Sequence, residues 1–376
     1  MGVTAFTSDR AHAEAFVRFG LERGSTIRGW IPPITAALHA QMAPEYPFYG
    51  APGNHRRHFL CTAAGRLVGR VSAFVNAKLV DEGGAPIGAV GLFEAIEDES
   101  VSRELLDAAT GWLASAHGIR RTWGPIDFDI WRGYRFMTRG FDQEPFFGEP
   151  TNPPWYPEHF ARYGFSVLQT WATREVRGRE AIVGLARATE ARLRAFEARG
   201  HRFRPLDRSR LSEELGVLHA LTSASFASFL GFTPIPREEF EGLFAISRHA
   251  LVPELIPIVS APGGEPVAFA AALPDIAPAV RAMRGSHGAL ARLRFRLMPP
   301  RMRRVVLFFG GMLPGHLRER AGLGRTGVHL VSKHAAALGC ETLIVALAAS
   351  GNASASLMGD HRHAVTREYA LFELRP

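Results

Sequence analysis

Residues 305–327 read Val-Val-Leu-Phe-Phe-Gly-Gly-Met-Leu-Pro-Gly-His-Leu-Arg-Glu-Arg-Ala-Gly-Leu-Gly-Arg-Thr-Gly, and this stretch decides the fold. Residues 305–313 are apolar throughout, which predicts a buried β-strand. A glycine-rich segment follows and leads into a helix predicted for residues 324–338. Glycines let a ligand approach the backbone, and the free N–H groups at the start of a helix bind phosphate. The stretch therefore predicts a phosphate-binding turn between a strand and a helix.

Working outward from this stretch, we find one succession of elements twice. After residue 178 the pattern predicts helices at 180–199 and 211–229 and strands at 202–205, 255–260, 267–273, 305–313, 342–347 and 369–374. Before it come a helical start, a hairpin of 59–62 with 66–75, a strand at 88–94, a helix at 100–117 and a strand at 121–123. The repetition predicts two consecutive domains, 1–178 and 179–376, of the α/β (α+β) class. The first contains a long aromatic loop at 124–157, and the second a basic insertion at 276–304.

The glycines of the stretch also match a dinucleotide-binding pattern, Gly-x-Gly-x-x-Gly, at Gly322, Gly324 and Gly327. That interpretation requires an acidic residue for the ribose at the end of the next strand. The sequence there is Leu347-Ala-Ala-Ser-Gly351, which contains no acid. The dinucleotide interpretation is therefore rejected.

The stretch instead resembles the pyrophosphate loop of the GNAT superfamily of acyl-CoA N-acyltransferases, a strand followed by [Gln/Arg]-x-x-Gly-x-Gly/Ala. Gly322 and Gly324 fill the glycine positions, Gly339 ends the helix at the usual interval, and Asn352 matches the family's Asn after the next strand. The resemblance implies two GNAT-like domains, each a mixed, mostly antiparallel sheet flanked by helices, of which the first is degenerate. It implies acyl-CoA as a co-substrate, with no permanently bound cofactor. The residues expected to hold it are Gly311, Met312, Leu313, Arg318, Arg320, Gly322, Leu323, Gly324, Arg325 and Asn352.

Two positions depart from the family pattern. Glu319 stands where the family has Gln or Arg. Gly359 stands where many members have a Tyr that protonates the departing CoA thiolate. That role is therefore either unfilled or performed by another residue.

A closer resemblance rests on six motifs in order: Phe93-Glu94, Trp123-Gly-Pro125, Gly140-Phe-Asp-Gln143, Asn152-Pro-Pro-Trp-Tyr156, Leu273-Pro-Asp275 and the Gly322 loop. The set is similar to a bacterial tandem-GNAT group that includes bacterial ceramide synthases. Those enzymes move a fatty acyl chain from a thioester onto a sphingoid amine. The resemblance implies sphingolipid biosynthesis, with a long-chain amine as the acceptor.

Amide formation from a thioester requires a base for the amine, donors for the oxyanion and an acid for the thiolate. The predicted catalytic residues are Glu94, Asp127 and Asp275, with Tyr156 as a displaced general acid; Glu149 is a further candidate base. Asp127 and Asp129 would face one side if their segment is extended. Paired Gly310 and Gly311 permit a splayed strand whose N–H groups bind the oxyanion. The residues predicted to contact the acceptor are Asp129, Tyr134, Asp142, Asn152 and Trp155.

Charge and composition narrow the partners. The net charge is +8, and Arg281–Arg304 contains eight arginines and no acid. Set on one helix, Val280, Met283, Leu290, Leu293 and Leu297 share a stripe, a pattern typical of a helix on an anionic membrane surface. The two distant cysteines and the histidines among arginines predict no metal site, and the leaderless N-terminus predicts a cytoplasmic protein, peripheral on the inner face of the membrane. DNA and RNA are not the expected partners. The alternatives left open are an aminoacyl-tRNA-dependent amide-forming transferase and a non-catalytic acyl-CoA-binding protein.

Overall fold

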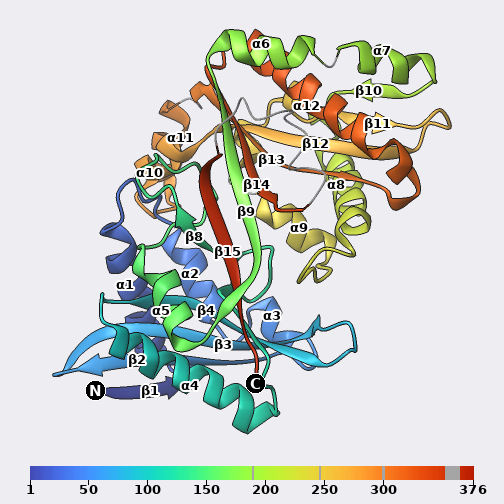
Figure 1. Ribbon diagram of the computed structural model, residues 1–376. Coiled ribbons are helices and arrows are strands. Elements are labelled where there is room, and N and C mark those ends of the chain that lie inside the picture. The colour runs from blue at the N-terminus through green and yellow to red at the C-terminus, as the bar shows by residue number, and fades with distance from the viewer. Residues whose placement is uncertain (189, 245–246, 299–300, 352–364) are drawn as a thin grey trace.

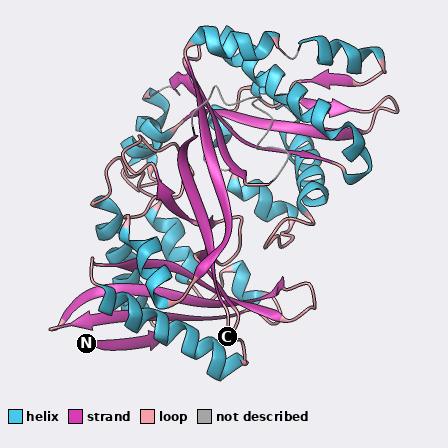
Figure 2. Cartoon of the chain, viewed as in Figure 1, coloured by secondary structure: helices cyan, strands magenta, loops and turns pink. Residues whose placement is uncertain are grey.

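The computed structural model describes residues 1–188, 190–244, 247–298, 301–351 and 365–376. Helices and strands build an upper and a lower half in the view of Figure 1, and two long strands run between them (Figures 1 and 2). Within the described ranges, no helix combines the length and the apolar character needed to cross a bilayer.

The first half contains fourteen of the described elements. They are β1 (Gly2–Phe6), α1 (Arg10–Ser25), α2 (Thr35–Met42), α3 (Pro47–Gly50), β2 (His55–Ala63), β3 (Arg66–Val80), β4 (Pro86–Ala95), α4 (Glu99–His117), β5 (Thr122–Gly124), β6 (Ile126–Asp127), β7 (Gly133–Tyr134), β8 (Phe136–Arg139), α5 (Trp155–Tyr163) and β9 (Ser166–Arg177). The predicted hairpin is confirmed: β2 and β3 pair around a turn in which Ala64 and Gly65 have positive φ. The helical start is preceded by a strand, β1, and this strand was not predicted. The long strand β9 was also not predicted.

The second half follows the predicted order more closely. Its elements are α6 (Arg179–Arg187), α7 (Glu190–Ala198), β10 (Arg202–Arg204), α8 (Leu211–Phe226), α9 (Arg237–Leu243), β11 (Ile258–Ser260), β12 (Pro266–Asp275), α10 (Ala277–Met283), α11 (Ala289–Leu297), β13 (Arg301–Met312), α12 (Arg320–Ala337), β14 (Thr342–Ala349) and β15 (Val365–Leu374). Short 3-10 helices lie at Arg208–Arg210, Ser247–Ala250, Pro253–Leu255 and Pro314–Glu319. The helix predicted at 180–199 is two helices, α6 and α7.

One sheet runs through both halves. Among the described residues it has 13 strands in the order β1-β2-β3-β4-β5-β15-β9-β14-β13-β12-β11-β10, with β8 paired to β15. The last strand of the chain, β15, lies between β5 and β9, and β9 lies between β15 and β14. The two halves therefore share their last strands, which are the long strands in Figure 1. The α/β (α+β) class with a mixed, mostly antiparallel sheet flanked by helices is confirmed, and neither half completes its sheet alone.

Each half has one parallel pair of neighbouring strands, and there the sheet opens. β4 pairs with β5 only at residues 88 and 89, and β13 pairs with β14 only over 304–307. Past these points the first strand of each pair is irregular. Leu92 in β4 has a φ of 48°, and the register of β12 with β13 shifts opposite Phe308. Such a bulge turns backbone groups away from the ladder, so each half contains one potential ligand site at an open strand pair.

Helices pack on the strands of each half and hold the two open strand pairs in place. α4 and α5 pack on the first half around Leu105, Leu113 and Phe160, all fully buried. α12 packs with α6 on the second half around Val331 and Ala335, also fully buried. Burial of such side chains contributes roughly 1.5–3 kcal/mol each for Val, Leu and Phe, so the strands at the openings are firmly supported.

The basic insertion is not the single amphipathic helix that was predicted. Arg284 and Gly285 have φ of 51° and 72°, and they separate α10 from α11. As a result Val280 and Met283 are buried, 2% and 3% exposed, in the core. The other members of the stripe are on the surface of α11: Leu290, Leu293 and Leu297 are 60%, 51% and 71% exposed.

Candidate active site

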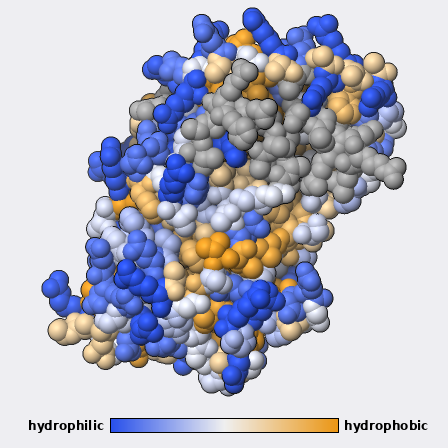
Figure 3. All heavy atoms as spheres, viewed as in Figure 1, coloured by the Kyte–Doolittle hydropathy of each residue, from blue (hydrophilic) through white to orange (hydrophobic). Residues whose placement is uncertain are grey.

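A cavity of about 1270 Å³ lies between the two halves, larger than the roughly 300–1,000 Å³ usual for small-molecule sites. Its wall is mostly aromatic and aliphatic, with Phe226, Phe229, Phe232, Phe240, Phe244, Phe308 and Phe309 among its members. The charged residues on the wall are Arg70, Glu94, Asp127, Arg132, Arg135 and Glu149. Figure 3 shows hydrophobic surface gathered between the two halves. The cavity suits a ligand with a long apolar part and a few polar groups.

The open pair β13/β14 forms one wall of the cavity. Phe308 to Met312 of β13 line it together with residues 346–351, the end of β14 and the two residues after it. Both segments lie beyond Leu307 and Val345, the last residues through which the two strands pair with each other. Gly310 and Gly311 leave no room for side chains, since a Cβ on Gly310 would lie 2.9 Å from the carbonyl oxygen of Phe269. Towards β14 this segment has no strand partner among the described residues, so the backbone groups that face that way are open to a ligand.

Part of α12 lies on the same wall. Gly324 and Gly327 line the cavity, and α12 begins at Arg320, directly after a 3-10 helix at Pro314–Glu319. The predicted turn is therefore shorter than expected, because the helix begins four residues before Gly324. Of the other residues expected to hold coenzyme A, Met312 also lines the cavity. The side chains of Arg318, Arg320, Leu323 and Arg325, and all of Asn352, lie outside the described part of the chain.

The equivalent opening in the first half is filled. The hairpin β6/β7 approaches it, and the Asp127 carboxylate accepts a hydrogen bond of 2.5 Å from the Leu92 N–H of β4. A Cβ on Gly91 would lie 2.0 Å from the Ile126 carbonyl oxygen, so the hairpin packs directly on the strand. The Leu92 N–H is therefore already bonded and is not open to a ligand. The filled opening is what we would expect of a first domain that is degenerate.

Glu94 and Tyr156 form a bonded pair on the cavity wall. The Tyr156 hydroxyl donates to Glu94 at 2.7 Å and accepts from the Ala95 N–H at 3.0 Å. The Arg70 guanidinium lies 4.0 Å from Glu94. Burial raises the pKa of Glu94 above its usual value, although Arg70 acts in the opposite direction. Burial and the neighbouring Glu94 raise the pKa of Tyr156 well above 10.

The two aspartates of the β6 region do not face one side, as an extended segment would require. Phe128 between them has a φ of 68°, which turns the chain. Asp129 bonds to the Trp131 N–H at 2.9 Å and to Arg132, and it is 5% exposed. Asp127 alone lines the cavity, and burial raises its pKa to about 6.

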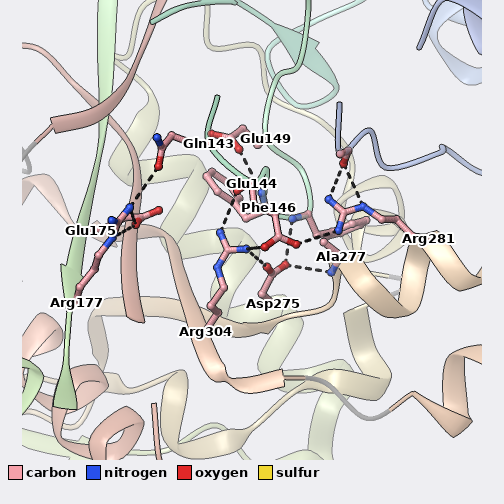
Figure 4. A network of polar contacts seen from close by, with 12 residues as sticks. Gln143, Glu144, Phe146, Glu149, Glu175, Arg177, Asp275, Ala277, Arg281 and Arg304 are labelled. Atoms are coloured by element: carbon pink, nitrogen blue, oxygen red, sulfur yellow. Dashed lines mark hydrogen bonds and ion pairs between the residues drawn. The ribbon is translucent and has the colours of Figure 1, made fainter. Parts of the chain in front are cut away.

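Asp275 belongs to a structural network and does not line the cavity. Its carboxylate forms an ion pair of 3.1 Å with Arg304 and accepts from the N–H groups of Phe147 and Ala277 at 3.3 and 3.0 Å (Figure 4). Glu144 joins Arg304 to Arg281 in the same network. Asp275 therefore joins the aromatic loop to the start of α10. All its contacts are internal, which does not fit the predicted catalytic role.

The residues predicted to contact the acceptor divide into two groups. Tyr134 and Asn152 line the cavity. Asn152 is already bonded, since its amide pairs with the N–H and carbonyl of Met137 at 2.7 and 3.2 Å. Asp142 is exposed and accepts from Gln143, and Trp155 packs beside Tyr156; neither lines the cavity.

A buried group that the predicted site did not include joins the last strand to the aromatic loop. Arg367 and Tyr369 of β15 both bond to Glu149, Arg367 at 3.0 Å. Burial raises the pKa of Glu149 to about 7, against the opposing effect of Arg367. The signal was present in the sequence, because Arg367 and Tyr369 are two residues apart and thus share one face of a strand. Among the described residues, no three His, Cys, Asp or Glu side chains come together to hold a metal ion.

Fold and site together define the class: this is a tandem protein of the GNAT fold, with one open and one filled strand pair. The chain is similar in structure to a tandem GNAT protein from the clavulanic acid biosynthesis pathway, with a TM-score of 0.52 and 11% sequence identity. The match covers 100% of this chain and 99% of that protein. A GCN5-related N-acetyltransferase of Anabaena variabilis matches with a TM-score of 0.54 and 6% sequence identity, over 99% of this chain and 72% of that protein. These likenesses establish the fold.

Two further comparisons bear on particular proteins. The glucosamine N-acetyltransferase region of a fungal multi-domain GH3 β-N-acetylglucosaminidase gives a TM-score of 0.55 at 13% identity over 99% of this chain, which spans 38% of that protein. In sequence, the chain is similar to Protein YghO of Escherichia coli (strain K12), 25% identical over 278 residues, or 73% of this chain and 68% of that protein. No family model matches the chain.

Proposed function

We propose that the protein is an acyl-CoA-dependent N-acyltransferase whose thioester binds at the open pair β13/β14. The observation that carries the proposal is the opening itself: Gly310 and Gly311, which pair with β12 but with no described strand on the side towards β14, line the same cavity as Gly324 of α12. A helix N-terminus favours phosphate, and N–H groups of an opened strand favour a developing oxyanion. Both features lie on one wall of the cavity, where we place the coenzyme pyrophosphate and its thioester.

In this proposal the acceptor amine approaches from the first half. Glu94 and Asp127 line the cavity there, and a carboxylate is the group needed to take the proton from an ammonium. Tyr156 holds Glu94 in place by its hydrogen bond of 2.7 Å. Because its hydroxyl proton is donated to Glu94 and its oxygen accepts from the Ala95 N–H, we assign Tyr156 a positioning role and not that of the acid that protonates the thiolate.

The phenylalanine-rich wall supports a long-chain substrate. Sixteen carbons exceed acetyl by fourteen methylenes, or very roughly 11 kcal/mol of transfer free energy, which such a wall can recover. A long-chain amine of the sphingoid type, as used by ceramide synthases, is the first acceptor to test. The acyl-CoA is a co-substrate in every case.

We also propose that α11 contacts an anionic membrane surface at the inner face of the cytoplasmic membrane. Of the seven arginines in the insertion whose side chains the structure describes, three have acidic partners: Arg281, Arg303 and Arg304. On α11, exposed Leu290, Leu293 and Leu297 lie beside exposed Arg292 and Arg296, and arginines near such a surface contribute up to about 1 kcal/mol each.

The membrane proposal is tested by sedimentation with vesicles of phosphatidylglycerol and of phosphatidylcholine. Changing Leu293 and Leu297 to Gln should release the protein from the anionic vesicles. Leu338→Gln, at another exposed leucine, is the control and should have no effect. Equal binding by all three proteins would contradict the assignment of α11.

The transferase proposal is tested with the pure protein, palmitoyl-CoA or acetyl-CoA, and sphinganine in detergent, with mass spectrometry of the N-acyl product. Gly324→Trp should abolish turnover, because the side chain would occupy the wall at the start of α12. Gly184→Trp is the matched control, since Gly184 is an exposed helix glycine of α6 with open space around it. Equal turnover of the two variants would refute the proposed coenzyme site.

A further inference from the structure

Arg135 is a buried arginine in an unusual backbone conformation. It lies between β7 and β8 with a φ of 75°, and its N–H donates to the Pro125 carbonyl at 3.1 Å. A non-glycine residue with positive φ is strained, so this backbone would be more stable with glycine or asparagine. The arginine side chain is 9% exposed and lines the cavity. Its presence there requires an explanation beyond the backbone.

Aromatic rings hold the Arg135 guanidinium from two sides. Its central carbon lies 3.9 Å from the centroid of the Tyr134 ring and 4.7 Å from that of Trp171. The two rings themselves are 5.5 Å apart and nearly perpendicular. Faces of aromatic rings attract a cation, but they supply no hydrogen-bond acceptor for its N–H groups.

Among the residues that the structure describes, Arg135 forms no ion pair. Its Nε and Nη1 atoms are buried and have no hydrogen-bond partner. Other buried arginines differ: Arg367 pairs with Glu149 and Glu175, and Arg70 donates to the Phe16 carbonyl at 2.9 Å. Burial lowers the pKa of Arg135, with only tyrosines acting against it. A buried charge without a partner is costly, and buried charges in proteins are normally paired.

The same hairpin presents a carboxylate to the same cavity. Asp127 of β6 pairs in register with Gly133 of β7, two residues before Arg135. A Cβ on Gly133 would lie 2.3 Å from Asp127 Oδ2, so the carboxylate lies directly on β7. One short hairpin thus offers an acceptor for an ammonium group and, close by along the chain, a planar donor for an anion.

We infer that the acceptor amine carries an anionic group, a carboxylate or a phosphate, which binds the Arg135 guanidinium while the amine lies towards Asp127. The guanidinium fork matches both groups in geometry. This inference rests on the proposed function, and it narrows the acceptor from a neutral long-chain amino alcohol to an amine that also carries an anionic group.

The test compares matched acceptors with palmitoyl-CoA as donor. One pair is 2-aminohexadecanoate and 2-aminohexadecan-1-ol, and the other is sphinganine 1-phosphate and sphinganine. The wild-type protein should prefer one anionic member over its neutral partner by at least tenfold in kcat/KM, and the preferred pair tells a carboxylate from a phosphate. Equal or better use of the neutral member in both pairs would overturn the inference.

Three variants show whether Arg135 causes the preference. Arg135→Met should lose the tenfold preference, chiefly through a raised KM for the anionic acceptor. Arg135→Lys keeps the charge but not the fork, so it should recover only part of the preference. Arg139→Met is the control, because Arg139 lies on β8 at the surface, 63% exposed. If Arg135→Met slowed both members of a pair equally, the residue would not bind the anion.

Thermal stability and ligand binding test the inference without any measurement of turnover. Without ligand, Arg135→Met should unfold at the same temperature as the wild type or higher, because a buried unpaired charge is removed; a lower temperature would assign Arg135 a structural role. If no acceptor is acylated, the proposed function fails, but the inference can still be tested by the change in melting temperature when an acceptor is added. In that case the anionic acceptors should raise the melting temperature of the wild type and not of Arg135→Met. The absence of such a difference would overturn it.

Discussion

The assignment of Asp275 to structure leads to a quantitative prediction. Asp275→Ala removes an ion pair of 3.1 Å between side chains that are 2% and 18% exposed, and it removes the acceptor for two backbone N–H groups. Breaking a buried ion pair costs about 3–5 kcal/mol, and losing the hydrogen bond from the Ala277 N–H costs about 1 kcal/mol more. Arg304 keeps its second partner, Glu144, so the lower end of the range applies. The expected loss is therefore about 3–4 kcal/mol.

The assay is equilibrium unfolding in urea, read together with acyl transfer. Asp275→Asn keeps a backbone acceptor but loses the charge, so its unfolding free energy should fall between those of the wild type and Asp275→Ala. Asp142→Ala, at an exposed acid, should change stability by less than about 0.5 kcal/mol. At temperatures where each variant is folded, Asp275→Asn should retain turnover. Native stability combined with lost turnover would refute the structural assignment and return Asp275 to catalysis.

Three further predictions concern the cavity. Tyr156→Phe should lower the unfolding free energy by about 1–3 kcal/mol, because it leaves Glu94 and the Ala95 N–H without their hydrogen bonds to the hydroxyl. A thioester with a more acidic thiol should not restore the turnover of this variant. Restored turnover would make Tyr156 the general acid. If Asp127 takes the amine proton, kcat/KM should rise with pH around its pKa of about 6, and Asp127→Asn should lose this rise; an unchanged profile would exclude Asp127 as the base. Because the pKa of Asp127 is raised in the folded state, the stability that Asp127 contributes is complete below about pH 4 and is lost as the pH rises through 6. The unfolding free energy, measured by denaturation at several pH values, should therefore fall by ~1–3 kcal/mol over this range in the wild type and not in Asp127→Asn.

The local elements of the fold could be predicted from the sequence because their signals are local. The turn at Ala64 and Gly65 lies between two alternating segments, and Gly118 ends α4 in the left-handed conformation that glycine favours. The exchange of β9 and β15 could not be predicted in this way. Strand pairing across the molecule depends on partners about 200 residues apart, such as Tyr369 opposite Trp171, and no short segment encodes that choice.

The site was predicted in part for the same reason. Glu94, Asp127 and Tyr156 line the cavity, as chemistry-bearing residues at strand ends often do, and Gly311 and Gly324 lie on the expected wall. The positive φ of Phe128, Arg135 and Arg284 left no clear mark in the residue pattern, yet each redirects the chain. These turns separate Asp129 from Asp127, bring Arg135 into the cavity and divide the basic insertion into two helices.

The central claim, that the thioester binds at β13/β14, is tested most directly by a crystal structure with a non-hydrolysable thioether analogue of palmitoyl-CoA. The account predicts the pyrophosphate at the start of α12, the position of the thioester carbonyl beside Gly310 and Gly311, and the acyl chain along the phenylalanine wall. Coenzyme bound at β4/β5, where Asp127 occupies the Leu92 N–H, would contradict the account.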